Sequence, residues 1–306
     1  MALTLIVPCF NEELRLPEAE YVAWLASSAR AANVRLLFVD DGSRDGTVKV
    51  LQRICDRAPA GTASILVLEA NQGKAEAVRR GLMQAVGGYD SGADSSSMLV
   101  GFWDADLATP LDAVPQLAAV LHADAQLQMV FAARVALLGR KIERKIVRHY
   151  LGRVFATLAS LTLDLAIYDT QCGAKLFRVS PMLRTVVATP FITRWVFDCE
   201  MIGRYHALIA ASAGRSARDA SPPLEQIIYE YPLEKWTDVA GSKVKPWDIL
   251  RMALGLVRIR SVYFLHTWPG GARKPELYAA AAVLMVLAVV GVFALVSLAY
   301  TLLRLL

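Results

Sequence analysis

The chain has 306 residues, 55% of them hydrophobic, and a formal net charge of +5 at pH 7. This length is enough for one substantial domain with its own core and some accessory segments. The basic residues gather between Arg140 and Arg153 and beside an apolar C-terminal run, which favours an anionic lipid surface or a phosphate substrate over nucleic acid. The cysteines form no C-x-x-C pair, which argues against zinc and against a disulfide framework; they are Cys9, Cys55, Cys172 and Cys199.

Short apolar runs alternate with segments of helical spacing along the first half of the chain. The expected strands are Leu3–Val7, Val34–Val39, Ile65–Leu68, Met98–Trp103 and Met129–Ala132. The expected helices are Leu14–Ala32, Thr47–Arg57, Lys74–Val86 and Leu111–Leu121. Strands that alternate with helices of ordinary length predict an α/β domain whose mostly parallel sheet is covered on both faces.

The pattern changes after Arg134, where a long arginine-rich helix is expected over Lys141–Leu163. The elements expected next are the strand Ala174–Val179, helices near Leu183 and over Val196–Ala213, the strand Ile227–Tyr231 and a loop over Trp236–Lys243. Residues 1–235 are therefore expected to form one domain. Residues 236–276 are expected to hold a mobile loop and an amphipathic helix at a membrane interface, over Pro246–Phe264.

A long uncharged run predicts a single membrane span near the C-terminus. Residues 277–303 carry no charge and exceed the roughly 20 residues that cross a bilayer. Arg273 and Lys274 precede this run and only Arg304 follows it, so the N-terminal bulk is expected in the cytoplasm. No secretory signal is visible at the start of the sequence.

Polar motifs follow several of the predicted strands at the edge where open α/β sheets bind ligands. Asp104 and Asp106, one residue apart, can supply the hard oxygen ligands that Mg²⁺ or Mn²⁺ prefers, although a solvated turn would have the same pattern. Asp40-Asp41 could accept hydrogen bonds from a base or a ribose, or could form a glycine-containing turn. Asn71–Lys74 precedes a helix, where a diphosphate could bind the N-terminal amides and the lysine.

Seven motifs occur in order along most of the first 243 residues: PCFNEE, VDDGSRDGT, NQGKAEAVRRG, DADLATP, DTQCGAKLF, RWVFDCE and WTDVAGSK. Together they resemble the family-2 inverting glycosyltransferases of GT-A fold, in the branch that makes dolichyl- or polyprenyl-phosphate sugars. Within that branch the set is most similar to the dolichyl-phosphate β-glucosyltransferases. The resemblance implies an enzyme with a catalytic domain over residues 1–235. It would transfer a hexose, with glucose from UDP-glucose favoured, to a lipid phosphate with the help of Mg²⁺ or Mn²⁺.

The resemblance also implies roles for individual residues. Donor binding falls to Pro8, Glu12, Asp40, Asp41, Lys74, Asp104 and Lys243, with Asp104 and Asp106 as metal ligands. Acceptor binding falls to Arg144, Arg148, Gln171 and Trp195. The residues expected in catalysis are Asp106, Arg134, Arg148 and Asp198. An acceptor phosphate is already ionised at neutral pH and needs no strong base, but Asp198 or Asp169 would be the candidate if one were required.

Ala108 stands where the mannose synthases of this branch often carry a glutamine ligand, which favours glucose and leaves the metal's ligand set open. The alternatives are a GDP-mannose synthase of the same branch, a family-2 transferase with a saccharide or glycolipid hydroxyl acceptor, and a membrane-tethered scaffold with an inactive transferase fold. A hydroxyl acceptor would require a base and would not require Arg144 and Arg148. The alanine- and arginine-rich composition favours a prokaryotic plasma membrane, with the endoplasmic reticulum as the eukaryotic alternative. The oligomeric state is left open.

Overall fold

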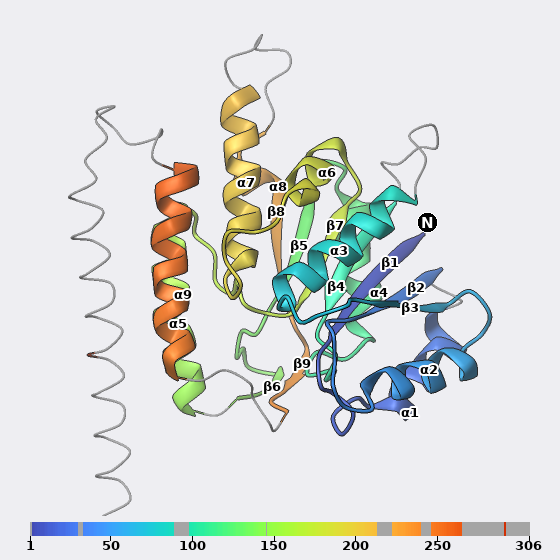
Figure 1. Cartoon of the computed structure of the whole chain (residues 1–306). Coiled ribbons are helices and arrows are strands. Elements are labelled where there is room, and N and C mark those ends of the chain that lie inside the picture. Colours follow the sequence, from blue (N-terminus) through green and yellow to red (C-terminus); the bar gives the residue numbers. More distant parts are fainter. Residues whose placement is uncertain are drawn as a thin grey trace, which may run out of the picture.

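The computed structural model describes residues 2–29, 33–88, 98–144, 146–212, 222–239, 246–264 and 291, with the side chains of residues 146–148 and 246 left out. Most of the described chain belongs to one α/β unit (Figure 1).

Seven strands form the main sheet in the order β3-β2-β1-β4-β7-β5-β8. Their bounds are β1 Leu3–Cys9, β2 Val34–Asp40, β3 Ala63–Val67, β4 Leu99–Trp103, β5 Met129–Ala133, β7 Ala174–Arg178 and β8 Ile228–Pro232. Strand β7 runs antiparallel to β4 and β5, and the other neighbours are parallel. The predicted mostly parallel sheet is therefore confirmed.

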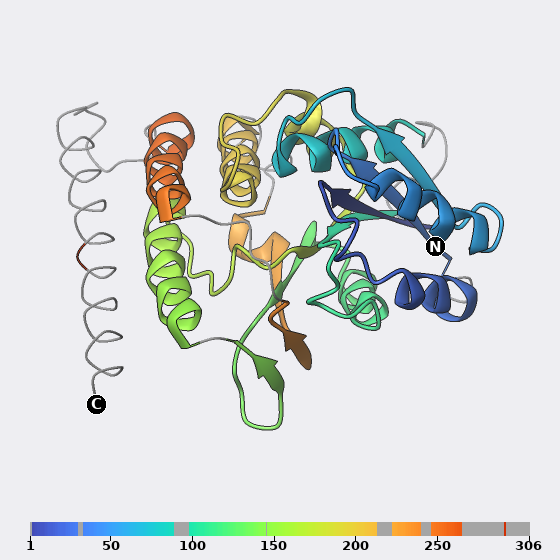
Figure 2. The same cartoon turned by 60° about the horizontal axis from the view of Figure 1, so that its bottom comes forward.

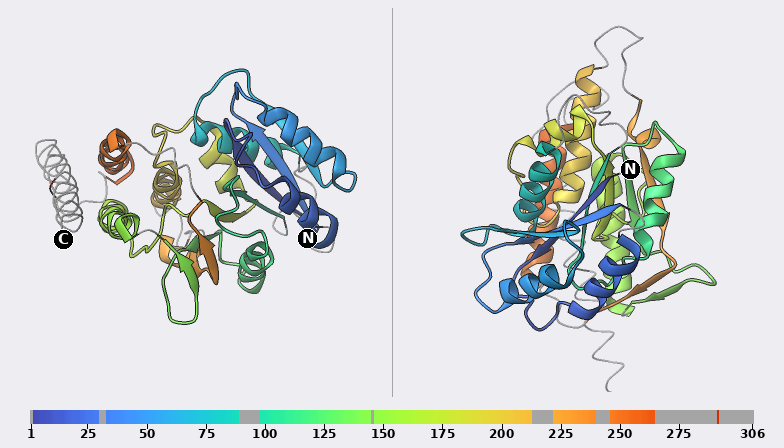
Figure 3. Two further views of the ribbon diagram at one scale, coloured as in Figure 1. Left: turned by 90° about the horizontal axis from the view of Figure 1, so that it is seen from below. Right: turned by 90° about the vertical axis from the view of Figure 1, so that its right-hand side faces the viewer.

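Helices cover both faces of this sheet (Figures 1 and 3). One face carries α1 Glu18–Trp24, α2 Thr47–Arg57 and α4 Ala113–Ala123. The other carries α3 Lys74–Gly87, α5 Ile146–Leu163, α6 Pro181–Ala188, α7 Phe197–Ser212 and α9 Pro246–Ile259, while α8 Leu224–Ile227 leads into β8. Successive strand residues point to opposite faces, so Leu5 and Val7 enter the first core and Ile6 the second.

The first predicted helix begins later than expected. Leu14–Ala32 was expected to be helical throughout, but α1 begins at Glu18, after Pro17, and a π-helical turn η1 follows over Leu25–Ala29. Proline disfavours helical backbone at the residue before it and fits the start of a helix, so Glu13 to Arg15 form a turn instead and Leu16 is not helical. Residues 30–32 lie outside the described chain.

The expected helix over Lys141–Leu163 is wrong in its first turn, because Lys141–Glu143 forms strand β6. This strand pairs in parallel with β9, Lys235–Thr237, inside the segment expected to be a loop. The two short strands form a ribbon that projects from the main sheet (Figure 2). Helix α5 begins only at Ile146.

The amphipathic helix expected over Pro246–Phe264 is α9 followed by the π-helical turn η3, Arg260–Phe264. It packs on α5 and α7 through Ala253, Leu256 and Ile259 and leaves Trp247 and Leu254 exposed. In the part of the chain that the structure describes, no helix combines the length and the apolar character needed to cross a bilayer. The predicted span over residues 277–303 lies outside the described residues, apart from residue 291.

Candidate active site

The carboxyl ends of three parallel strands meet at one edge of the main sheet. Strand β1 lies between β2 and β4, and Cys9 of β1 is opposite Asp40 of β2. The segments that follow these strands contact one another, since the Asn11 N–H donates to Ser43 Oγ at 2.9 Å. This edge is where ligands bind in open α/β sheets.

Asp104 and Asp106 follow β4 directly, and each carboxylate holds a basic side chain from another loop. Asp104 Oδ1 accepts from Lys74 Nζ at 2.5 Å, and Asp106 Oδ2 accepts from Arg15 Nη2 at 2.9 Å. Burial alone would raise the pKa of Asp104, but the Lys74 ammonium lowers it. Burial, together with the neighbouring Asp104, raises the pKa of Asp106. Lys74 and Arg15 therefore balance the negative charges of Asp104 and Asp106. The sequence did not predict that both basic side chains would meet at this acidic pair.

Asp40, one of the expected donor-binding residues, ends β2 in a buried position. Its Oδ2 accepts from the Ser43 N–H at 3.0 Å, whereas its buried Oδ1 has no hydrogen-bond partner in the described part of the chain. Such an oxygen can accept a hydrogen bond from a ligand N–H or O–H. Glu12 lies in the segment after β1 and holds Arg15 at 3.1 Å, and Pro8 lies within β1.

Asp41 shapes the loop that leads into α3. Its Oδ1 accepts from the Gln72 N–H at 2.8 Å, and its Oδ2 accepts from the Gly73 N–H at 2.7 Å and from Asn71 Nδ2 at 2.8 Å. Gly73 has a φ of 97°, which favours glycine at this turn. Both carboxylate oxygens of Asp41 are used by the loop, so this residue positions Lys74 at the start of α3.

Arg134 follows β5 and forms a buried, two-pronged ion pair with Asp169. The Arg134 Nε–Asp169 Oδ2 distance is 2.7 Å and the Nη2–Oδ1 distance is 2.8 Å. This pairing lowers the pKa of Asp169 to about 2, although burial alone would raise it. Glu230 of β8 fixes the same loop by accepting from the N–H groups of Tyr168 and Asp169 at 2.7 and 2.8 Å. Gln171 continues this loop, and its buried Nε2 has no partner among the described residues.

Arg144 lies between β6 and α5, near Arg134, and is half-buried. Burial and the like charge of Arg134 lower the pKa of Arg144. A carbon added at Gly152 of α5 would lie 2.4 Å from Arg144 Nη2, so the glycine makes room for the guanidinium. Among the described residues, no carboxylate forms an ion pair with Arg144. The side chain of Arg148, in α5, lies outside the description.

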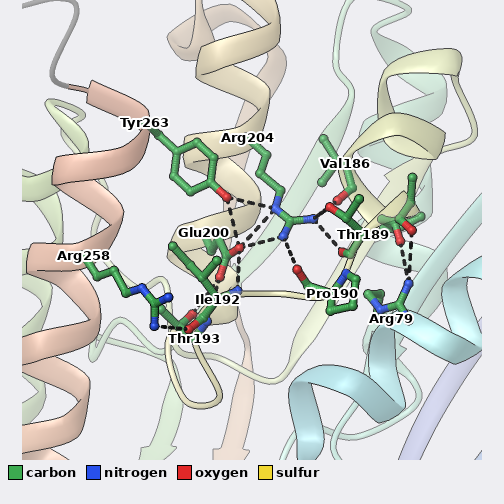
Figure 4. Close-up of polar contacts among 12 residues, drawn as sticks. Arg79, Val186, Thr189, Pro190, Ile192, Thr193, Glu200, Arg204, Arg258 and Tyr263 are labelled. Carbon is green, nitrogen blue, oxygen red and sulfur yellow. Dashed lines mark hydrogen bonds and ion pairs between the residues drawn. The ribbon is translucent and has the colours of Figure 1, made fainter.

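A buried cluster of polar side chains holds the loop between α6 and α7, residues 189–196, in place (Figure 4). Glu200 is fully buried and accepts from the N–H groups of Ile192 and Thr193 at 2.9 and 3.0 Å. Arg204 donates to Glu200 Oε1 at 2.8 Å, and the Tyr263 hydroxyl of η3 donates to the same oxygen at 3.2 Å. Arg204 also donates to carbonyl oxygens of Val186, Thr189 and Pro190.

This anchored loop reaches the donor side of the edge. Arg194 approaches the loop before α3, where its Nη2 lies 3.4 Å from Asn71 Oδ1. Trp195 follows it and is half-buried. Asp198, in the first turn of α7, lies 2.7 Å from the fully buried ammonium of Lys175. The two candidate bases, Asp169 and Asp198, are thus both held by a basic partner.

The comparison with known families decides the class of this site. The model of glycosyl transferase family 2 matches residues 4–184, more than half of the chain. The chain belongs to glycosyl transferase family 2. It is 31% identical to the dolichyl-phosphate β-glucosyltransferase of Drosophila melanogaster over 88% of this chain and 77% of the relative. It is 28% identical to that of Dictyostelium discoideum over 87% of this chain and 76% of the relative.

Solved structures share the fold at low sequence identity. A mannosyltransferase of Pyrobaculum calidifontis in complex with GDP-mannose and Mn²⁺ has a TM-score of 0.54 and 17% identity, over 99% of this chain and 79% of that one. The glucosyl-3-phosphoglycerate synthase of Mycobacterium tuberculosis in complex with Mn²⁺ and UDP-glucose has a TM-score of 0.51 and 19% identity, over 85% and 78%. These neighbours confirm the predicted GT-A fold.

The acidic pair has the chemistry that a divalent cation requires. Carboxylate oxygens are the ligands that Mg²⁺ and Mn²⁺ prefer, and both carboxylates carry cationic partners already. A carbon added at Gly173 would lie 1.9 Å from Asp104 Oδ2, so only glycine leaves this oxygen its room. Within the described chain, no group of three His, Cys, Asp or Glu side chains surrounds a common point. Water and substrate phosphate would have to complete the coordination shell.

The structure brings most of the expected residues to this edge and adds three others. Arg15, Gly173 and Glu230 were not expected there, although Arg15 lies three residues after Glu12 and Gly173 lies in a recognised motif. Lys243, expected to bind the donor, lies outside the described chain.

Proposed function

We propose that this enzyme transfers glucose from UDP-glucose to dolichyl or polyprenyl phosphate, with inversion at the anomeric carbon. Two dolichyl-phosphate β-glucosyltransferases are similar to this chain along most of its length, which supports glucose as the transferred sugar and a lipid phosphate as the acceptor. The observation that carries the proposal is an acidic pair of balanced charge together with a guanidinium, Arg144, that forms no ion pair among the described residues and interacts only with the more distant carboxylates of Asp169 and Asp238. The first suits a metal-bound diphosphate, and the second suits a phosphate acceptor.

On the donor side, Asp104 and Asp106 would hold Mg²⁺ or Mn²⁺, which neutralises charge on the diphosphate leaving group. Asp40 Oδ1, which has no hydrogen-bond partner among the described residues, would accept a hydrogen bond from the nucleoside. Lys74 stands at the first turn of α3, where backbone N–H groups also favour an anion.

In the proposed reaction, an oxygen of the lipid phosphate attacks the anomeric carbon. The new phosphate-oxygen–carbon bond forms as the bond to the diphosphate oxygen breaks, and the electron pair leaves with the nucleoside diphosphate. A phosphate monoester has a second pKa of about 6 and is already ionised at neutral pH, so no strong base is needed. This agrees with the ion pairs that occupy Asp169 and Asp198.

On the acceptor side, Arg144 has the properties of a phosphate ligand. A guanidinium that is half-buried beside another guanidinium is stabilised when it shares an anion, and its fork of donors matches phosphate oxygens. Arg148, in the first turn of α5, remains the second proposed ligand of the acceptor phosphate.

Membrane attachment is part of the proposal. Helix α9 would lie at the interface with Trp247 and Leu254 toward the lipid, and residues 277–303 would form a single span with the catalytic domain in the cytoplasm. This arrangement would present the lipid phosphate to Arg144 from the membrane side.

The test is a transfer assay on membranes that contain the full chain, with radiolabelled UDP-glucose or GDP-mannose and polyprenyl phosphate. Label from UDP-glucose should enter the organic phase as lipid-linked glucose. Label only in water-soluble products would refute the lipid acceptor, and preference for GDP-mannose would refute glucose. Arg144→Ala should raise the acceptor KM about tenfold and leave the donor KM unchanged. Arg57→Ala, which changes an exposed arginine on α2, is the matched control.

A further inference from the structure

Arg15 connects two acidic groups of the donor site. Its Nη2 lies 2.9 Å from Asp106 Oδ2, and its Nη1 lies 3.1 Å from Glu12 Oε2. The side chain is 22% exposed, so these pairs are only partly screened by solvent. One guanidinium therefore bridges the segment after β1 to the segment after β4.

Lys74 has the corresponding position on the other carboxylate. Its ammonium lies 2.5 Å from Asp104 Oδ1. Lys74 and Arg15 come from different loops, yet each occupies an oxygen of the acidic pair. Both expected metal ligands are thus engaged by a protein cation.

A divalent ion and a protein cation compete for the same carboxylate oxygens. A free ion that binds Asp104 and Asp106 either takes the oxygens that Lys74 and Arg15 hold or lies beside these two cations on the remaining oxygens. Both arrangements place positive charges close together and are unfavourable. When the ion arrives with a diphosphate, the displaced cations gain phosphate oxygens as new partners. The cost of exchange is therefore offset only when the nucleotide is present.

We propose that Arg15, together with Lys74, acts as an exchange cation that makes metal binding depend on nucleotide binding. Arg15 holds Asp106 in the nucleotide-free enzyme and turns to the diphosphate when the metal–nucleotide complex binds. This inference rests on the proposed metal-dependent donor site and adds a thermodynamic coupling between its two ligands. Such coupling is reciprocal, so the metal must strengthen nucleotide binding by the same factor.

The experiment compares the full-length enzyme with Arg15→Leu by direct binding, without turnover. Electron paramagnetic resonance of free Mn²⁺ gives the Kd for Mn²⁺ alone, and calorimetry with UDP gives the nucleotide Kd with and without Mn²⁺. Arg15→Leu should tighten the Kd for Mn²⁺ alone about tenfold and weaken the coupling between Mn²⁺ and UDP by a similar factor. Arg15→Lys keeps the charge but cannot contact Glu12 and Asp106 together, so its two binding constants should lie between those of the wild type and those of Arg15→Leu.

The controls separate this inference from the proposed function. Arg53→Leu removes an exposed arginine paired with Glu18 at 2.8 Å, far along the sequence from the acidic pair, and should change neither constant. An unchanged or weakened Kd for Mn²⁺ in both Arg15 variants would overturn the exchange role, because Arg15 would then only hold the carboxylates in place. A wild-type enzyme that binds neither Mn²⁺ nor Mn²⁺–UDP would instead refute the donor site itself.

Discussion

Replacing Asp169 with asparagine should destabilise the fold in a way that depends on pH. The change removes the negative charge from a carboxylate that is 9% exposed and holds Arg134 through two hydrogen bonds at 2.7 and 2.8 Å. The folded-state pKa of Asp169 is about 2, against an ordinary value of 3.8. This shift corresponds to roughly 2 kcal/mol at neutral pH. Leaving a buried guanidinium without its partner costs about 3–5 kcal/mol in comparable pairs. We therefore expect Asp169→Asn to lower the free energy of unfolding by about 2–5 kcal/mol.

The sign of the pH dependence follows from the lowered pKa. The ionised carboxylate contributes its stability fully above the unfolded pKa of 3.8 and loses it as the pH falls toward about 2. Urea unfolding of the full chain, followed by tryptophan fluorescence, should therefore show a large deficit for Asp169→Asn at pH 7. The deficit should shrink as the pH falls from about 4 toward about 2, because the carboxylate is protonated first in the unfolded and then in the folded wild-type protein.

The matched control is Asp56→Asn, the same chemical change at an exposed position of α2. The free energy of unfolding of Asp56→Asn should stay within about 0.5 kcal/mol of the wild-type value, both at pH 7 and below about pH 4. A deficit for Asp169→Asn that equals the control at pH 7, or that persists unchanged at low pH, would refute the assignment of this stability to the Asp169 charge.

Three further substitutions test other contacts of the site. Gly173→Ala places a carbon 1.9 Å from the present position of Asp104 Oδ2, so Mn²⁺-dependent transfer should fall at least about tenfold while the melting temperature changes little; unchanged activity would contradict the tight packing. Tyr263→Phe removes the hydroxyl that donates to buried Glu200 and should cost about 1 kcal/mol in urea unfolding, whereas equal stability would show that this bond contributes nothing. Glu230→Gln weakens the hydrogen bonds that this carboxylate accepts from the N–H groups of Tyr168 and Asp169. The loop should then hold Arg134 less firmly, so kcat should fall. Steady-state kinetics that show an unchanged kcat, with only the stability altered, would contradict this role.

The sequence predicted the parts of this enzyme that depend on local pattern. The alternation of apolar runs and helical spacing predicted the layered sheet, and the acidic residues at strand ends predicted the edge that carries the site. Both predictions work because a parallel strand brings its C-terminal residues to the same edge as its neighbours. The motifs then identified the family, which the match over residues 4–184 confirms.

Contacts between distant segments were not predictable in this way. Arg15 and Asp106 are 91 residues apart, and Glu230 is 62 residues from Tyr168. The ribbon of β6 and β9 was missed for the same reason, because Lys141–Glu143 becomes a strand only through its pairing with Lys235–Thr237. No periodicity within either segment indicates the other.

The role of Asp41 also depends on such a contact. The motif places it beside Asp40 as a donor-binding residue, but the loop before α3 takes up both of its carboxylate oxygens. Its effect on the donor would pass through the position of Lys74. Adjacent carboxylates in one motif can therefore differ in function when only one of them, here Asp40, keeps an unpartnered oxygen within the described structure.

The donor and acceptor sides of the site differ in how their charges are balanced. On the donor side, Asp104 and Asp106 each have a cation at 2.5 and 2.9 Å, so an anionic nucleotide gains partners only when these ion pairs open. On the proposed acceptor side, Arg134 is neutralised by Asp169, but among the described residues Arg144 forms no ion pair and interacts only with the more distant carboxylates of Asp169 and Asp238. If Arg144 holds the lipid phosphate, as proposed above, the phosphate would bind it without disrupting an ion pair of the described structure. The donor has to exchange partners and the acceptor does not, so donor affinity should respond to the divalent ion far more than acceptor affinity does.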